Sequence, residues 1–219
     1  MLYGTLKLLS RVILRLCFRQ RAVGLEHVPA VGPALLAANH VSFLDPPAIG
    51  APVGRQLHYL AKQELFGVPL VGGLIRRLNA HPVAREQADA AALRLALSLL
   101  KAGHALLVFP EGTRGREGTL GEGRAGVGML AARAGVPVIP VFVEGTGRVL
   151  PRGASFPRLA RITVAYGPPL HFERQRGKQR YQAVSDAIMA AIARLRDEVA
   201  GQTTMDPTAA RALSAGRIH

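Results

Sequence analysis

The chain has 219 residues, of which 49% are hydrophobic, and this length and composition predict one folded domain and exclude a disordered chain. Lysine and arginine number 28 against 14 aspartates and glutamates, and the net charge of +14 predicts anionic partners such as phospholipid head groups, phosphorylated substrates or nucleic acid. Aromatic residues make up only 5%, with no tryptophan, which gives little capacity for base stacking, so we do not expect a nucleic-acid partner.

The first predicted element is an amphipathic helix over residues 1–19. These residues are mostly apolar, and Lys7, Arg11, Arg15 and Arg19 recur every four positions, which on a helix draws one basic stripe. A helix that spans a bilayer needs about 20 mostly uncharged residues. We therefore predict a monotopic anchor that lies in the membrane interface, with its cations among anionic head groups. The alternative is a helix packed on the core of the domain.

Residues 20–200 show the pattern of a single α/β domain. Short apolar runs predict strands, and helical periodicity predicts helices between them. The expected strands are Ala34–Ala38, Leu57–Ala61, Ala105–Phe109, Pro137–Val143 and Arg161–Tyr166. The expected helices are Glu86–Lys101, Arg124–Ala134 and Arg180–Ala200. This alternation predicts a mostly parallel or mixed central sheet flanked by helices, followed by a loosely ordered tail over residues 201–219.

The segment Asn39-His40-Val41-Ser42-Phe43-Leu44-Asp45 carries the first chemical signal. On an ideal helix His40 and Asp45 would point about 140° apart, so one helix face cannot bring them together. Asp45 and the two prolines after it are typical of a helix start, with Asp45 as N-cap. We predict a loop between strand and helix in which Asp45 accepts the Nδ1–H of His40 and orients the ring as a base. The competing interpretation is a capping aspartate beside a surface histidine.

A short apolar segment, Val68-Pro69-Leu70-Val71, runs on to the basic pair Arg76-Arg77. It has two interpretations that the sequence leaves open. It is either a second contact with the membrane or the end of a core helix.

The segment Phe109-Pro110-Glu111-Gly112-Thr113-Arg114 carries the second chemical signal. Gly112 permits a backbone that other residues resist, and Arg114 can hold a phosphate through two parallel hydrogen bonds. We expect Glu111 either to brace Arg114 or to accept from a substrate hydroxyl. Taken alone, the hexapeptide is typical of a surface turn. Together with the His40 segment, the hexapeptide predicts an anion-binding arginine next to a base. Both segments directly follow predicted strands, and ligand sites in such sheets lie at the ends of strands.

Other catalytic and binding motifs are absent from the sequence. His40 has no second histidine at helical spacing and there is no cysteine pair, so we expect no zinc site. There is no G-x-S-x-G elbow, and the single cysteine, Cys17, lies in the predicted anchor, so we expect no covalent catalysis. The glycine-rich loop after Arg114 lacks the spacing of a P-loop or a dinucleotide fingerprint.

Together the two segments resemble the glycerolipid acyltransferase family typified by bacterial 1-acyl-sn-glycerol-3-phosphate acyltransferases. Four family blocks match in order between about residues 24 and 143: Asn39 to Asp45, Gly73 to Arg85, Phe109 to Arg114, and Val136 to Val141. The first and third are specific in order and spacing, whereas the second is loose and the fourth is a plain buried strand.

Two positions depart from the family pattern. Ala84 stands where an acidic residue often precedes the arginine of the second block, and Arg124 stands where a lysine often precedes the fourth block. Both changes affect the expected acceptor site and leave the acyl-transfer residues unchanged.

The resemblance implies transfer of a fatty acyl group from acyl-CoA or acyl carrier protein to the free hydroxyl of 1-acyl-sn-glycerol-3-phosphate, which gives phosphatidic acid. It implies His40 as general base oriented by Asp45, no acyl-enzyme and no cofactor. The implied acceptor-binding residues are Asn39, Arg85, Glu111, Gly112, Thr113, Arg114, Arg124 and Pro140. Since acceptor and product stay in the bilayer, we expect a peripheral, monotopic protein on the cytoplasmic face of the cell membrane. The alternatives are another lysophospholipid or amino-acid lipid as acceptor, and a non-catalytic basic membrane-binding module.

Overall fold

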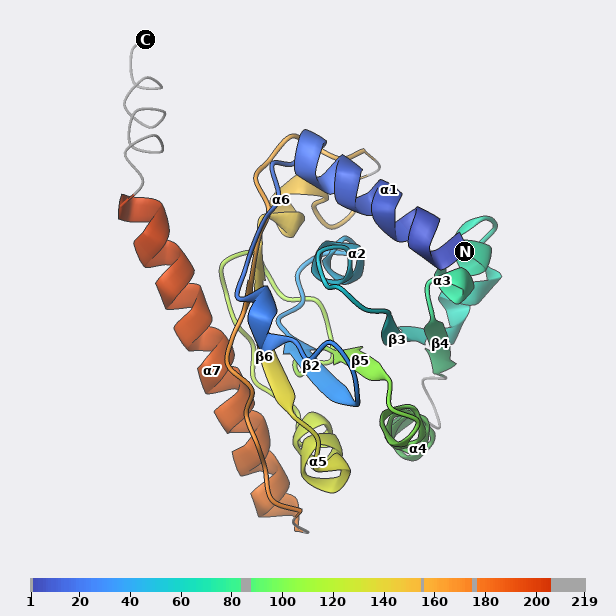
Figure 1. The fold of residues 1–219 in the computed structure, drawn as a ribbon, viewed down its shortest axis with the longest axis vertical. Helices are drawn as coiled ribbons and strands as arrows, with labels where there is room; N and C mark the ends of the chain where they lie inside the picture. Colours follow the sequence, from blue (N-terminus) through green and yellow to red (C-terminus); the bar gives the residue numbers. More distant parts are fainter. Residues whose placement is uncertain (1, 84–87, 155, 175–176, 206–219) are drawn as a thin grey trace.

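The computed structural model describes residues 2–83, 88–154, 156–174 and 177–205. Its strands are β1 (Arg21–Val23), β2 (Ala34–Ala38), β3 (Leu57–Lys62), β4 (Ala80–Val83), β5 (Ala105–Val108), β6 (Val138–Glu144) and β7 (Thr163–Tyr166). They form one sheet in the spatial order β1-β7-β6-β2-β5-β3-β4 (Figure 1). Neighbouring strands are parallel except β6 and β7, which run antiparallel. The expected mostly parallel or mixed sheet is confirmed.

Helices cover both faces of this sheet, as predicted. They are α1 (Leu2–Cys17), α2 (Asp45–Gly50), α3 (Val71–Arg77), α4 (Ala88–Lys101), α5 (Ala125–Ala134), α6 (Thr146–Val149) and α7 (Lys178–Met205), with 3₁₀ turns η1 (Leu25–His27) and η2 (Gln63–Gly67). The helices α1, α2 and α6 lie on one face, and α4, α5 and α7 lie on the other (Figure 1).

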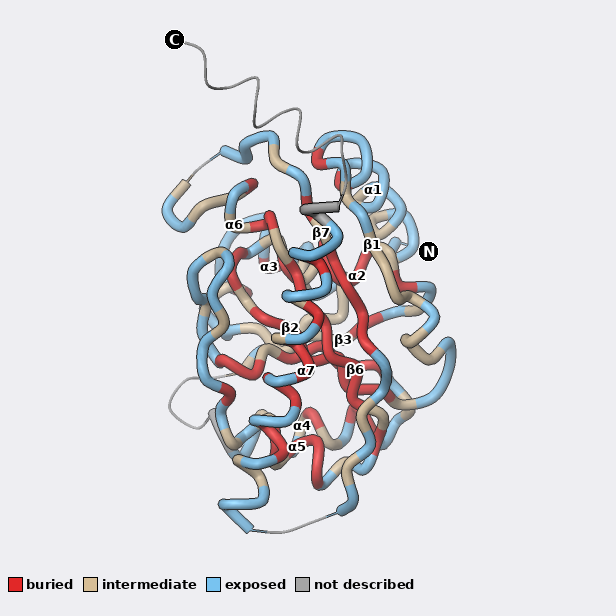
Figure 2. Tube along the Cα trace, turned by 90° about the vertical axis from the view of Figure 1, so that its left-hand side faces the viewer, coloured by how far each residue is buried: buried red, intermediate tan, exposed pale blue. Residues whose placement is uncertain are grey.

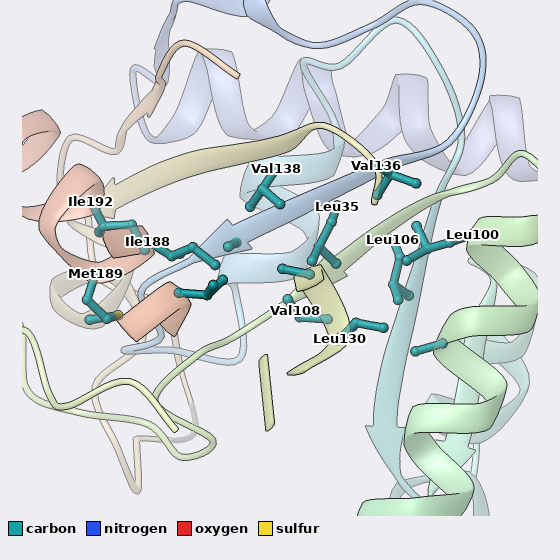
Figure 3. Packing of buried hydrophobic residues seen from close by; sticks show 14 of the residues in the cluster. Leu35, Leu100, Leu106, Val108, Leu130, Val136, Val138, Ile188, Met189 and Ile192 are labelled. Carbon is teal, nitrogen blue, oxygen red and sulfur yellow. The ribbon is translucent and has the colours of Figure 1, made fainter. Parts of the chain in front are cut away.

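Each face of the sheet buries its own apolar cluster, because side chains alternate along a strand. Leu106 of β5 belongs to one cluster with Leu130 of α5 and Ile188 of α7 (Figure 3). Its neighbour Leu107 points the other way and joins Ile49 of α2. The tube in Figure 2 shows the central strands as buried. Burial of each large aliphatic side chain stabilises the fold by about 1.5–3 kcal/mol, so the sheet is a rigid support for the loops at its ends.

The sequence pattern predicts the five inner strands to within two residues and misses β1 and β4. These two are the edge strands, only three and four residues long. Because an edge strand is half exposed, it does not need a continuous apolar run, and β4 even contains Pro82.

The predicted end of the last helix is wrong by five residues. We expected a tail from Gly201, but α7 continues through Gly201 to Met205. Glycine weakens a helix without breaking it, and the first proline after the start of α7 is Pro207. Residues 206–219 lie outside the described part of the chain.

The N-terminal helix α1 packs on the domain through one face. Leu14 is buried, and the Nζ of Lys7 donates to the carbonyl oxygens of Val53 and Arg55, the latter at 2.7 Å. Desolvation by burial, and then the charge of Arg11, lowers the pKa of Lys7. The expected stripe of four cations toward the membrane is therefore wrong at Lys7, which turns inward because the loop after α2 offers it carbonyl oxygens.

The opposite face of α1 is apolar and exposed. Leu8 is 62% exposed and Leu16 is 74% exposed, with Leu9 and Val12 between them. In the part of the chain that the structure describes, no helix combines the length and hydropathy needed to cross a membrane. The interpretation of a helix packed on the domain is confirmed for the face that carries Leu14 and Lys7. The monotopic anchor stays a prediction, for which the exposed apolar face is available.

Three histidines gather on the face of the sheet that α4 covers. Nδ1 of His58 lies 2.9 Å from Nε2 of His81, and the ring of His58 stacks on that of His104 at 4.2 Å. Burial, together with the charges of His104 and His81, lowers the pKa of His58 to about 4. Among the described residues, no group of three or more potential ligands is arranged to hold a metal ion.

This cluster predicts a loss of stability in mild acid. Because the pKa of His58 is about 4 in the folded protein and near 6.5 otherwise, the unfolded chain binds the extra proton between these values. The free energy of unfolding should fall as the pH drops from 6.5 toward 4, and His58→Gln should flatten this slope. Urea unfolding at several pH values, with exposed His171→Gln as the control, measures it. An unchanged slope in His58→Gln contradicts the assignment.

Candidate active site

The site begins where the central strand β2 ends. The loop from Asn39 leads into α2, and the Nδ1 of His40 lies 2.7 Å from Oδ2 of Asp45. Asp45 is fully buried, whereas the side chain of His40 is 18% exposed. The predicted fold-back of His40 onto Asp45 is confirmed.

The carboxylate of Asp45 accepts four hydrogen bonds. Its Oδ2 accepts from His40 and from the backbone N–H groups of Val41 at 2.7 Å and Ser42 at 2.8 Å. Its Oδ1 accepts from the hydroxyl of Thr146 at 2.5 Å. A buried carboxylate is tolerated only when it is bonded in this way, so these four donors fix its position.

The predicted role of Asp45 as helix N-cap is wrong. Leu44 occupies the N-cap, and Asp45 is the first residue of α2. Its side chain turns back toward the preceding loop, because the N–H groups of Val41 and Ser42 lie there. The carboxylate therefore organises the loop that carries His40.

The ring of His40 is held on its flat side as well as at Nδ1. It stacks on the ring of Phe109 with 4.0 Å between centroids and an interplanar angle of 17°. In the described part of the chain, Nε2 of His40 has no hydrogen-bond partner. The ring is thus anchored through Nδ1 and presents its second nitrogen as the available base.

The second segment is bonded directly to the first through Glu111. Its Oε1 accepts from the N–H of His40 at 3.1 Å, and its Oε2 accepts from the N–H of Gly121 at 3.0 Å. The N–H of Gly115 donates to the carbonyl of His40 at 2.7 Å. Glu111 is only 6% exposed. Among the described residues Glu111 makes no ion pair with Arg114, so the expectation that it braces Arg114 is wrong. Its contact with a substrate hydroxyl stays a prediction.

Two arginines lie near this loop or the turn that follows it, Arg114 at the end of the second segment and Arg124 further along the chain. The guanidinium of Arg114 lies 3.8 Å from the ring centroid of Phe43, which belongs to the His40 loop. Gly112 has the predicted left-handed backbone, with φ of +67°, and a Cβ there would come within 2.7 Å of Nε of Arg124. Thr113 is exposed between them. Within the described residues neither arginine has an ion-pair partner, so both are available to an anion.

Two of the predicted acceptor-binding residues, Asn39 and Pro140, are not brought into this group. The amide of Asn39 is buried and bonds both the carbonyl (2.8 Å) and the N–H (2.7 Å) of Val143, which extends the pairing of β2 with β6. Pro140 is buried in β6, where its carbonyl accepts from Gly167. Both are structural residues in this geometry. Arg85 lies outside the described residues.

Two residues of the site escaped the sequence analysis. Thr146 bonds Asp45, and Glu117 holds the short helix α6 that carries Thr146. The carboxylate of Glu117 accepts from the N–H groups of Gly145 and Gly147, the latter at 2.8 Å. The sequence did contain a signal for Thr146, because Gly145-Thr146-Gly147 directly follows β6. Polar residues that follow neighbouring parallel strands, here β2 and β6, meet at the same edge of the sheet.

Comparisons with known proteins show which enzymes this chain is similar to. The chain is 27% identical to the 1-acyl-sn-glycerol-3-phosphate acyltransferase of Bacillus subtilis over 86% of this chain and 94% of that protein. It is 30% identical to the enzyme of that name from Pseudomonas aeruginosa, over 87% of this chain and 76% of that protein. It matches the chloroplast enzyme LPAT1 of Arabidopsis thaliana with 32% identity over 68% of this chain, but spans only 42% of that protein.

The fold matches a solved structure of the same kind. The crystal structure of the 1-acyl-sn-glycerophosphate acyltransferase PlsC from Thermotoga maritima superposes with a TM-score of 0.73 and 26% sequence identity. The match covers 89% of this chain and 79% of that chain. The sequence model of the acyltransferase family matches residues 19–144, more than half of the 219 residues, and includes both His40 and Arg114. The chain therefore belongs to the acyltransferase family.

Proposed function

We propose that this acyltransferase moves a fatty acyl group from an acyl thioester, acyl-CoA or acyl carrier protein, to the free hydroxyl of 1-acyl-sn-glycerol-3-phosphate. The product is phosphatidic acid. The observation that carries the proposal is the hydrogen bond between His40 and Asp45, which leaves Nε2 without a partner among the described residues. Two arginines without ion-pair partners contact the neighbouring segments, Arg114 at Phe43 and Arg124 at Gly112. The relatives named above support this choice of acceptor through their own names.

In the proposed reaction, Nε2 of His40 takes the proton of the acceptor hydroxyl while that oxygen attacks the thioester carbonyl. Asp45 stabilises the resulting imidazolium through Nδ1–H. When the tetrahedral intermediate collapses, the carbon–sulfur bond breaks and the imidazolium returns its proton to the departing thiolate. Proton transfer and the reactivity of the thioester suffice, and no resident cofactor takes part.

We propose that two arginines bind the phosphate of the acceptor. The guanidinium of Arg114 borders the loop of His40, and that of Arg124 lies against Gly112 of the adjoining turn. A guanidinium matches the geometry of a phosphate oxygen pair. Thr113, exposed between them, offers a hydroxyl. We place the acceptor phosphate here, which brings the adjacent glycerol hydroxyl toward His40.

We further propose a peripheral, monotopic position on the cytoplasmic face of the membrane. The exposed face of α1 is formed by large aliphatic side chains, with Arg11 and Arg15 also exposed. A helix of this kind lies in the interface with its apolar side among the acyl chains. The acceptor and the product of the proposed reaction are lipids of the same bilayer.

The base is tested by His40→Ala. Loss of general-base catalysis should lower turnover by about 10²–10⁴-fold while acceptor binding is largely retained. Product analysis with purified protein, lysophosphatidate and acyl-CoA measures this, with exposed His171→Ala as the matched control. Full activity in His40→Ala would reject the mechanism. In an acceptor panel, acylation of a different lysolipid in place of lysophosphatidate by the wild-type protein would reject the proposed acceptor.

The contact from Thr146 to Asp45 predicts a separate effect. Thr146→Val keeps the shape but removes the donor to Oδ1, so the carboxylate is less firmly oriented and kcat should fall roughly tenfold. Thr146→Ser, which keeps the hydroxyl, should restore most of it, and the acceptor KM should stay constant in both. Equal kcat values for the valine variant and the wild type would show that this hydrogen bond does not position the dyad.

The phosphate clamp predicts a change in KM. Arg114→Ala removes a charge-assisted hydrogen bond, so the acceptor KM should rise about tenfold and depend less on salt. Arg194→Ala on α7, which removes an exposed arginine far along the chain, is the matched control. Steady-state kinetics at two salt concentrations measures both. An unchanged KM with unchanged salt dependence contradicts the clamp.

The anchor is best tested with point variants, because truncating α1 would also remove the buried Leu14. The double variant Leu8→Ser, Leu16→Ser makes the exposed face polar and leaves the docked face intact. Co-sedimentation with anionic vesicles should fall by at least tenfold. Val31→Ser, which changes an exposed apolar residue in the loop before β2, should have no effect. Undiminished sedimentation of the double variant would exclude α1 as the anchor.

A further inference from the structure

A second apolar segment is exposed at the turn between η2 and α3, which we name the Leu70 turn (residues 68–74). Leu70 is 92% exposed, and Val68, Val71 and Leu74 are exposed beside it. The active site makes no use of this segment.

The backbone of the Leu70 turn is strained. Leu70 has φ of +64° and ψ of −47°, and the N–H of Val71 donates to the carbonyl of Pro69 at 2.7 Å. This is a γ-turn with positive φ, a form that is rare because it strains any residue with a Cβ. A glycine would relieve the strain, yet the position holds a large apolar side chain. Such strain is characteristic of a position kept for something other than stability.

The base of the turn is firmly held. Phe66 is buried, and a Cβ at Gly72 would come within 2.2 Å of its carbonyl oxygen, so α3 sits directly on η2. The guanidinium of Arg76 lies 5.4 Å from the ring centroid of Phe66. These contacts prevent Leu70 from folding back onto the protein and keep it in solvent.

The charge around the turn is positive. Arg76 and Arg77 are exposed at the end of α3, and the sequence has no acidic residue between Glu64 and Glu86. In Figure 1 the turn and α3 lie at the same margin of the molecule as the N-terminal end of α1, and Figure 2 shows both in its upper half. The Leu70 turn therefore lies toward the same end of the molecule as the N-terminal end of α1.

We propose that the Leu70 turn is a second membrane contact, with Leu70 inserted among the acyl chains of an anionic bilayer and Arg76 and Arg77 bound to head-group phosphates. This inference rests on the membrane position proposed above. A single interfacial helix leaves a protein free to roll about the helix axis. A second contact away from that axis fixes the orientation of the domain, and with it the direction in which the His40 loop faces the lipid.

The chain has no tryptophan, so one introduced indole reports on its own position. Leu70→Trp is mixed with vesicles of phosphatidylglycerol and phosphatidylcholine. Its emission should shift to the blue and be quenched by lipids brominated on the acyl chains. Val31→Trp is the matched control and should do neither, whereas Leu16→Trp on α1 should do both. A water-like, unquenched emission at position 70 while position 16 is quenched would overturn the proposal.

Leu70→Gly separates the membrane role from a structural one. Relief of the strained turn should raise Tm by about 2–4 °C, while loss of the inserted side chain should weaken vesicle binding about tenfold. Unchanged vesicle affinity in this variant also overturns the proposal. The binding readouts do not depend on acyl transfer, so an inactive wild type with an inserted Leu70 would reject the catalytic proposal alone. An active wild type with a solvated position 70 would reject the turn alone.

Discussion

The buried carboxylate of Asp45 is the interaction on which the site depends. It accepts from the ring of His40, from two N–H groups of the same loop and from Thr146, which lies about a hundred residues further along the chain. Because a charge buried without partners costs several kcal/mol, the loop after β2, the start of α2 and the start of α6 must come together. The orientation of the imidazole is a consequence of that requirement.

Two neighbouring carboxylates are also bonded to backbone N–H groups, as that of Asp45 is. The carboxylate of Glu111 accepts from backbone N–H groups of His40 and Gly121, and that of Glu117 accepts from those at the start of α6. The amide of Asn39 extends the pairing of β2 with β6. These groups make a rigid cradle, which leaves the exposed Thr113 and the two unpaired arginines as the side chains free to meet an anion. A histidine ring held in this way, with unpaired arginines in the adjoining turn, suits the proposed acceptor, which carries a phosphate next to its hydroxyl.

The inner strands, the helices on both faces and the contact of His40 with Asp45 could be predicted from the sequence, because each has a local signature. The roles of Asn39, Glu111 and Pro140 could not, since a buried polar group or proline in a motif looks the same whether its partner is a ligand or a backbone group 27 to 104 residues away. Thr146 was missed for the same reason. The inward turn of Lys7 depends on carbonyl oxygens that only the folded loop after α2 presents.

The central claim is that Asp45 holds one tautomer of His40, with the proton on Nδ1 and the lone pair on Nε2. Nitrogen-15 NMR of the ring of His40 near neutral pH, with the signal assigned through His40→Gln, tests it most directly. The account predicts a protonated, pyrrole-like Nδ1 and an unprotonated, pyridine-like Nε2. The reverse assignment, or a rapidly averaged pair of tautomers, would contradict it.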